Sequence, residues 1–248
     1  MDALARLEPI ARPLLRQIDE ALETLGAPPA HEVWSLLRQV GATPADAVTA
    51  FADLIGADLS GADSLGRDSL GSDSLGSDSL GGGLRAAAGT LRELAEQYAA
   101  VAIPAGVPWA GGAGEAYSAR AAALASYLHG DDDDTMAGRL ATTASYVDDV
   151  ADWQARSRDR IARALADVLS SAQAVTLRMQ SASGSGSGAG RVEAAADVGA
   201  HVLAAAADAL ADGHDVHRAW ADRLDELPFR GPLDAGPGRF DTAIRLSH

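Results

Sequence analysis

The chain has 248 residues, of which 47% are hydrophobic but only 4% aromatic, and its net charge is −15. This acidic balance disfavours nucleic acid and anionic membrane surfaces as partners, because binding to either relies on clustered Lys and Arg. Cysteine does not occur, which excludes disulfides, a thiol nucleophile and a thiolate metal site.

The composition predicts an all-α fold. Apolar content without aromatic rings comes mainly from Ala, Leu and Val, and Ala and Leu are among the strongest helix formers. Strands favour β-branched and aromatic residues, and aromatic residues are scarce here. All 20 basic residues are Arg, and neither Lys nor Asn occurs. This bias indicates a high-GC genome such as that of an actinobacterium.

Residues 1–57 are predicted to form a small N-terminal module of three helices. Apolar residues recur every three or four positions in the first helix, which should begin near Pro9, because proline lacks an amide proton, and end at Gly26. A second helix is expected over residues 29–40, and a third follows with Thr43 as its N-cap.

Residues 58–83 form an acidic low-complexity segment in which Asp-Ser-Leu-Gly recurs every five residues from Asp63. Regular Gly breaks helices and Asp-Ser favours turns, so a disordered linker is predicted. Two alternatives stay open: a coil of a pentapeptide-repeat β-helix, and a segment that binds a cation. The first is disfavoured because solenoids need several stacked turns to bury a core.

Residues 84–227 are predicted to form a helical hairpin or bundle. A helix of about 20 residues begins at Leu84, and a second begins near Gly112, after a turn rich in Pro and Gly. The acidic run over residues 131–134 should cap the helix that follows it, since carboxylates suit the positive end of a helix dipole. Residues 228–248 should be an extended tail rich in Pro and Gly.

The third helix of this region carries a heptad-like apolar stripe from Met136 to Met179 and is predicted to be the longest element. A flexible connector over residues 181–190 leads to a last helix, which Gly213 should weaken. Ala at many inward positions buries little area per turn, so part of the stripe should stay exposed. We therefore expect a homo-oligomer or a complex with a helical partner.

No residue pattern in the chain predicts catalysis. His214 and His217 share a helix face, but no third ligand lies nearby on that face, so a solvated face is favoured over a zinc site. Histidine, serine and aspartate occur elsewhere, but not around a nucleophile elbow, and a phosphate loop with its Lys is impossible without Lys. The predicted catalytic residues, metal sites and cofactors are therefore none, and the protein is not expected to be an enzyme.

Trp109 and Gly111 lie in the turn between the helices that begin at Leu84 and near Gly112. This Trp-Ala-Gly turn resembles that of the WXG family of type VII secretion substrates, over about residues 84–180, and Tyr117 looks like the enlarged actinobacterial members. The resemblance implies an antiparallel hairpin with the Trp filling the notch at its bend. The alternative is a Trp that simply packs at a helix start.

The same family carries an export signal, a Tyr followed four residues later by an acidic residue. Tyr127 with Asp131 fits this pattern, although closer to the Trp-Xaa-Gly turn than in small family members. Tyr146 lies at a better distance, but Val150 stands where the acid should be.

The expected function is therefore that of a non-enzymatic, secretion-associated helical protein, either a type VII substrate or an accessory factor that acts by helix–helix binding. Its expected partners are a helical protein or a second copy, together with the secretion machinery. No membrane span is expected, and export should use a leaderless route to the medium or the cell surface. The alternative is a cytoplasmic scaffold or chaperone that is not exported. An enzyme or toxin is disfavoured, because no catalytic domain follows the helical region.

Overall fold

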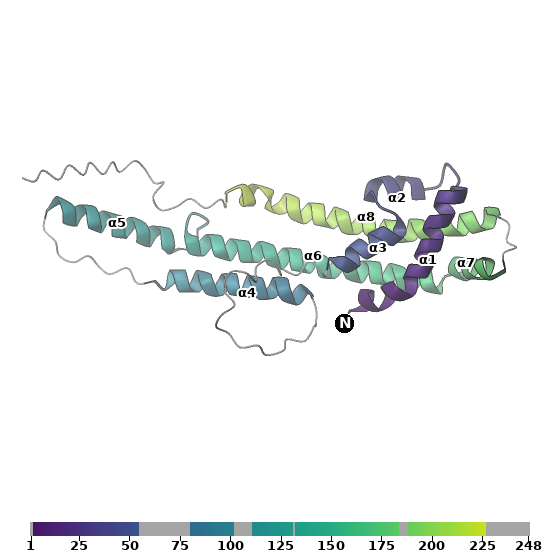
Figure 1. Ribbon diagram of the computed structural model, residues 1–248. Coiled ribbons are helices and arrows are strands. Elements are labelled where there is room, and N and C mark those ends of the chain that lie inside the picture. Colours follow the sequence, from purple (N-terminus) through teal and green to yellow (C-terminus); the bar gives the residue numbers. More distant parts are fainter. Residues whose placement is uncertain (1, 55–79, 102–110, 131, 184–187, 227–248) are drawn as a thin grey trace, which may run out of the picture. The chain divides into compact units, whose positions relative to one another are not determined.

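The computed structural model describes residues 2–54, 80–101, 111–130, 132–183 and 188–226 (Figure 1). Those residues form eight α-helices, which confirms the predicted all-α class. The predicted repeat linker up to residue 79, Trp109 and the tail over residues 228–248 lie outside the described residues. In chain order the helices are α1 (Ala3–Leu25), α2 (Val33–Val40), α3 (Pro44–Asp53), α4 (Leu80–Ala99), α5 (Gly112–Leu128), α6 (Met136–Ser170), α7 (Ala172–Ser183) and α8 (Gly188–Glu226).

The chain divides into two compact units that do not follow the predicted boundaries. Unit 1 contains Met1–Ala87 and Val147–Ala219, and unit 2 contains Ala88–Tyr146 and Trp220–His248. The N-terminal helices α1, α2 and α3 form as predicted, but they share one compact unit with residues from α6, α7 and α8. Helix α4 begins at Leu80, within the segment predicted to be linker.

Helix α1 begins six residues before the predicted start at Pro9. Asp2 is its N-cap, and the Asp2 side chain accepts a hydrogen bond of 2.8 Å from the Ala5 amide. Pro9 and Pro13 both lie inside the helix on its exposed side. The carbonyl groups that these prolines leave without an amide donor can be hydrated there, so the helix continues through them.

The core of unit 1 joins α1 and α3 to α6, α7 and α8. Ile161, Leu165 and Val168 of the predicted partner-binding stripe lie in this core, so the protein's own helices cover this part of the stripe. The stripe residues still exposed at its end include Val175 and Met179. The largest side chains with under 2% exposure in this core are Leu4, Leu15, Ile18, Val33, Val48, Ile161, Leu165, Leu177, Val202 and Leu203.

Helices α6 and α8 run antiparallel in unit 1. Trp153 of α6 lies against Gly213 of α8, and further along α6 Asp167 reaches His201, which precedes Gly213 in α8. The indole Nε1 of Trp153 also donates a hydrogen bond of 2.8 Å to the Ala209 carbonyl. These contacts define a long antiparallel helix pair on α6 and α8.

Gly213 does not interrupt α8, which continues from Gly188 to Glu226. A Cβ atom on Gly213 would lie 2.9 Å from two ring carbons of Trp153, so the glycine makes room for the indole. Residues Gly188–Asp225 are also long and apolar enough to cross a membrane, and 67% of the most apolar window is buried inside the protein. A buried core helix has the same composition.

The predicted helix over Met136 to Met179 is broken at Ser171, and α8 rather than α6 is the longest helix described. The Ser171 hydroxyl donates to the Val168 carbonyl at 2.8 Å and accepts from the Ala174 amide at 3.1 Å. It therefore caps the start of α7. The heptad spacing does not predict this break, because a serine that caps a helix can occupy a polar position of the same pattern.

Candidate interaction site

The Trp-Xaa-Gly turn is described only at its last residue. Gly111 is the N-cap of α5 with φ 98°, a conformation that residues with a Cβ rarely adopt. No described atom lies within 4 Å of the place where its Cβ would be. The backbone conformation by itself favours a glycine here, and Trp109 lies outside the described residues.

The ends of α4 and α5 differ from the predicted hairpin. The ring Nε2 of His129, the C-cap of α5, lies 2.8 Å from the carbonyl oxygen of Val101, just beyond α4. An antiparallel hairpin would instead bring the N-terminal end of α5 to the end of α4. Among its described side chains α5 buries only Gly114. Its Ala-rich faces give it few large groups with which to pack along a neighbour.

The structure describes one of the two residues of the predicted export signal. Tyr127 lies in α5 and is partly buried, whereas Asp131 lies outside the described residues. The Tyr127 hydroxyl oxygen is buried and has no hydrogen-bond partner among the described residues.

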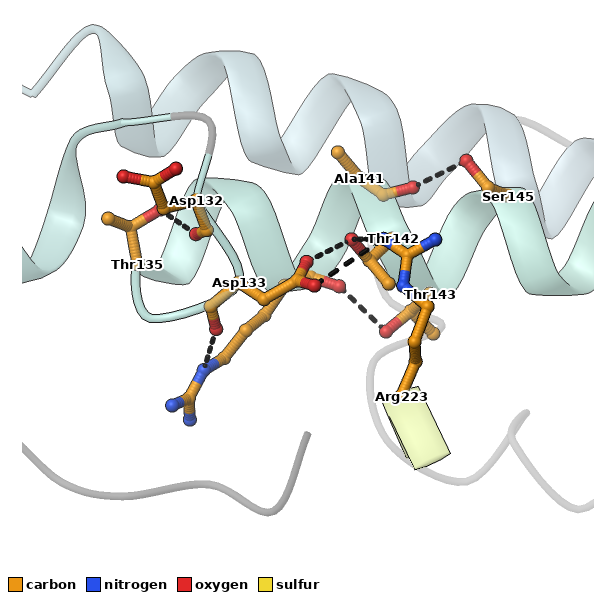
Figure 2. Close-up of polar contacts among 9 residues, drawn as sticks. Asp132, Asp133, Thr135, Ala141, Thr142, Thr143, Ser145 and Arg223 are labelled. Atoms are coloured by element: carbon orange, nitrogen blue, oxygen red, sulfur yellow. Dashed lines mark hydrogen bonds and ion pairs between the residues drawn. The ribbon is translucent and has the colours of Figure 1, made fainter. Parts of the chain in front are cut away.

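The acidic run leads into a tightly bonded turn at the start of α6 (Figure 2). The cap of α6 is the hydroxyl group of Thr135, which accepts a hydrogen bond of 3.0 Å from the Gly138 amide. The same hydroxyl lies 2.9 Å from the Gly130 carbonyl and 2.8 Å from that of Asp132. Among the described residues, the group that accepts this hydrogen bond at the start of α6 is thus a neutral threonine hydroxyl, whereas the acidic run was predicted to cap the helix.

Asp133 of the acidic run bonds to side chains of α6 and α8 (Figure 2). It accepts a hydrogen bond from the Thr142 hydroxyl and lies 3.4 Å from a guanidinium nitrogen of Arg223 in α8. The hydrogen bond from Thr142, followed by that from Arg223, lowers the pKa of Asp133. The guanidinium of Arg223 lies 4.9 Å from the ring centroid of Trp220, a cation–π contact that joins the same cluster.

The large apolar side chains of α4 and α5 are substantially exposed. On α4 and just beyond it, Leu94, Tyr98 and Val101 follow a spacing of four and three residues and therefore share one face; we call them the α4 strip. On α5, Tyr117 and Leu124 lie seven residues apart, also on one face; we call them the α5 strip. Their exposures range from 37% for Leu94 to 43% for Tyr117.

The fully buried surfaces of α4 and α5 are small. On α4, the buried residues among those described are Ala88 and Ala95, which present a single methyl group each. Leu84, Leu91, Tyr127 and Leu128 are partly buried on the same helices, whereas the large apolar side chains of the α4 strip and the α5 strip are exposed.

A groove of about 270 Å³ lies in unit 1 between α6, α7 and α8, lined in part by Asp167, Ser171, Asp197 and His201. The imidazole of His201 lies 3.8 Å from Asp167. The Ser171 hydroxyl already caps α7, so it is not oriented as a nucleophile toward His201. Among the described residues no group of three His, Asp or Glu could hold a metal ion. His214 and His217 both lie exposed on α8.

The fold and these surfaces define an all-α protein built on the antiparallel pair α6 and α8, with large apolar side chains exposed on α4 and α5. Comparisons of the chain with protein-family models, with curated proteins and with solved structures found no match.

Proposed function

We propose that the chain is a non-enzymatic interaction protein that binds a helical protein, or a second copy of itself, through the α4 strip and the α5 strip. The observation that carries this proposal is the exposure of Leu94, Tyr98, Val101, Tyr117 and Leu124 on helices whose described buried residues are only alanine and glycine.

Two physical arguments support a partner at this surface. Most helical stability in proteins comes from tertiary packing and not from helix propensity, and α5 buries only Gly114 among its described residues. Removing apolar surface from water contributes about 25 cal/mol per Å². A partner helix with an apolar stripe would supply the missing contacts on α5 and gain that energy.

A pair of matched variants tests the surface. Replacing Tyr117 and Leu124 with Ser should abolish binding while leaving unit 1 folded. The control variant carries the same replacement at Val175 and Met179 of α7, which are exposed by 48% and 67%. This variant should still bind the partner. Light scattering on the purified protein identifies a homodimer, and affinity capture of each variant from the native host identifies a different protein. Equal loss, or equal retention, of the partner in both variants would contradict the proposal.

We further propose that this binding serves type VII secretion, with the chain as a substrate or accessory factor. Its support is the resemblance of Trp109-Ala110-Gly111, between two helices of an Ala-rich chain, to the turn of the WXG family. The alternative is a scaffold or chaperone that stays in the cytoplasm. Appearance in culture filtrate that is lost on deleting the secretion ATPase would support secretion. Retention in the cell, with the partner still bound, would favour the scaffold.

A further inference from the structure

His31 lies between the start of α2 and the side of α8. The amide of Val33, the first residue of α2, donates a hydrogen bond of 3.1 Å to His31 Nδ1. The other ring nitrogen, Nε2, lies 3.2 Å from Asp197 Oδ1 of α8. Glu32, the N-cap of α2, makes no capping bond with its side chain, so the imidazole supplies the acceptor for the Val33 amide.

These two contacts determine where the proton of the neutral imidazole lies. Nδ1 accepts from an amide and therefore carries no hydrogen, so the single proton is on Nε2, which donates it to Asp197. The opposite tautomer would set Nδ1–H against the Val33 N–H and the Nε2 lone pair against the carboxylate, so it would lose both bonds. Because the His31 side chain is only 18% exposed, water has little room to replace either partner.

We propose that His31 is a proton-operated cap, which joins α2 to α8 through two bonds when it is neutral and through one bond when it is protonated. An imidazolium donates from both nitrogens and accepts at neither. Protonation therefore ends the bond from Val33, sets two donors against each other and puts a positive charge at the positive end of the α2 dipole. The bond to Asp197 persists as an ion pair.

The charged groups near the imidazole do not change which of the two bonds is lost. Asp197 contacts the ring from α8, and Glu32 is exposed next to it in the chain. Asp167 and His201 line the groove that Asp197 also lines. A carboxylate can attract the imidazolium, but it cannot give back to Nδ1 the lone pair that accepts from the α2 amide. Acid thus loosens the first turn of α2 and leaves its tether to α8.

NMR of the full chain tests the cap at the Val33 amide. Between about pH 8 and pH 5, where histidine changes charge, the Val33 amide signal should titrate together with the His31 ring. Exchange of this amide, corrected for its intrinsic rate, should become about fivefold faster on protonation, a typical effect of losing a cap. His31→Asn keeps an acceptor for the amide but cannot be protonated, so Val33 should stay protected throughout. His214→Asn, at an exposed position on α8, should behave as the wild type.

A second measurement needs no variant. The ¹⁵N chemical shifts of the neutral His31 ring in the wild type should show a proton on Nε2 and none on Nδ1. A proton on Nδ1 would overturn the proposal. A Val33 amide whose exchange does not change with the charge of His31 would overturn it as well, and so would the same pH dependence in His31→Asn, because the amide would then not depend on the ring.

Discussion

At the scale of single residues, the most specific contact is that between Trp153 and Gly213. The indole occupies the space that a Cβ on residue 213 would need, and it bonds to the carbonyl of Ala209 one turn earlier in α8. Helix propensity makes Gly213 a weak point of α8, but packing makes it necessary. Trp153 is thus a Trp that packs against a glycine, whereas Trp109, for which the resemblance predicts such packing, lies outside the described residues.

Gly213→Ala should destabilise the protein, although Ala is the better helix former. We expect a loss of about 1–3 kcal/mol, because the methyl group overpacks the site and must displace the indole. Urea unfolding followed by Trp fluorescence measures it. Gly89→Ala, in α4 with nothing within 4 Å of its Cβ position, is the control and should stabilise by up to about 1 kcal/mol. A stabilised Gly213→Ala variant would mean that the indole is easily displaced.

Arg158 and Asp2 form a second specific contact between segments far apart in the sequence. Arg158 is 7% exposed, pairs with Asp2 at 2.6 Å and donates to the carbonyls of Phe51 and Ala52. It thereby ties the start of α1 and the end of α3 to α6. Its hydrogen bond lowers the pKa of Asp2.

The Asp2–Arg158 pair should therefore weaken in acid. Its stabilisation is present above the unfolded pKa of 3.8 and is lost as pH falls through the lower folded pKa. Asp2→Asn keeps an N-cap but removes the charge, so the free energy of unfolding should depend less on pH between about pH 5 and pH 2. Asp53→Asn, at an exposed position on α3, serves as the control. If the free energy of unfolding of both variants keeps the pH dependence of the wild type in acid, the pair does not contribute to stability.

At the scale of helices, hydroxyl groups decide where α6 and α7 begin. Thr135 caps α6 and Ser171 caps α7, and each hydroxyl accepts from the amide three residues later. Such a bond satisfies an amide that has no partner within its helix. Periodicity cannot locate these points, because the apolar spacing continues past them.

Thr135→Ala should lower the free energy of unfolding by about 1–2 kcal/mol, since the amide of Gly138 loses its acceptor. Thr143→Ala makes the same chemical change inside α6, where the Thr143 hydroxyl bonds to the Arg139 carbonyl. Ala has the higher helix propensity, so this control should be neutral or stabilising. Chemical denaturation of both variants under one condition compares them. Equal effects would show that the Thr135 cap contributes nothing specific.

At the scale of the whole molecule, the N-terminal helices complete a core that they do not close by themselves. Leu15 and Ile18 of α1 lie in one cluster with Ile161 and Leu165 of α6 and with Leu203 of α8. The boundary predicted near residue 57 follows composition, whereas the core crosses it.

A fragment that starts at residue 55 should therefore lose cooperative unfolding and self-associate. Without α1 and α3, Ile161, Leu165 and Leu203 would become exposed, and burial of each such side chain contributes about 1.5–3 kcal/mol. Calorimetry and light scattering on the fragment, compared with the full chain, make the test. A monomeric fragment with an unchanged cooperative transition would show that residues 1–57 are not needed to complete the core.

The sequence by itself determined the all-α class and the approximate places of the helices, because Ala and Leu content and apolar spacing are local properties. It also located the caps Thr43 and Gly41, whose hydrogen bonds lie within a few residues. Only the tertiary structure decided that α6 pairs with α8, that Gly213 receives Trp153 and that Ile161 and Leu165 of the long stripe lie in one core with α1. Those outcomes depend on which helix faces meet. Packing between segments far apart in the sequence is decided by side-chain volume and burial, and it leaves no periodic signal in either segment alone.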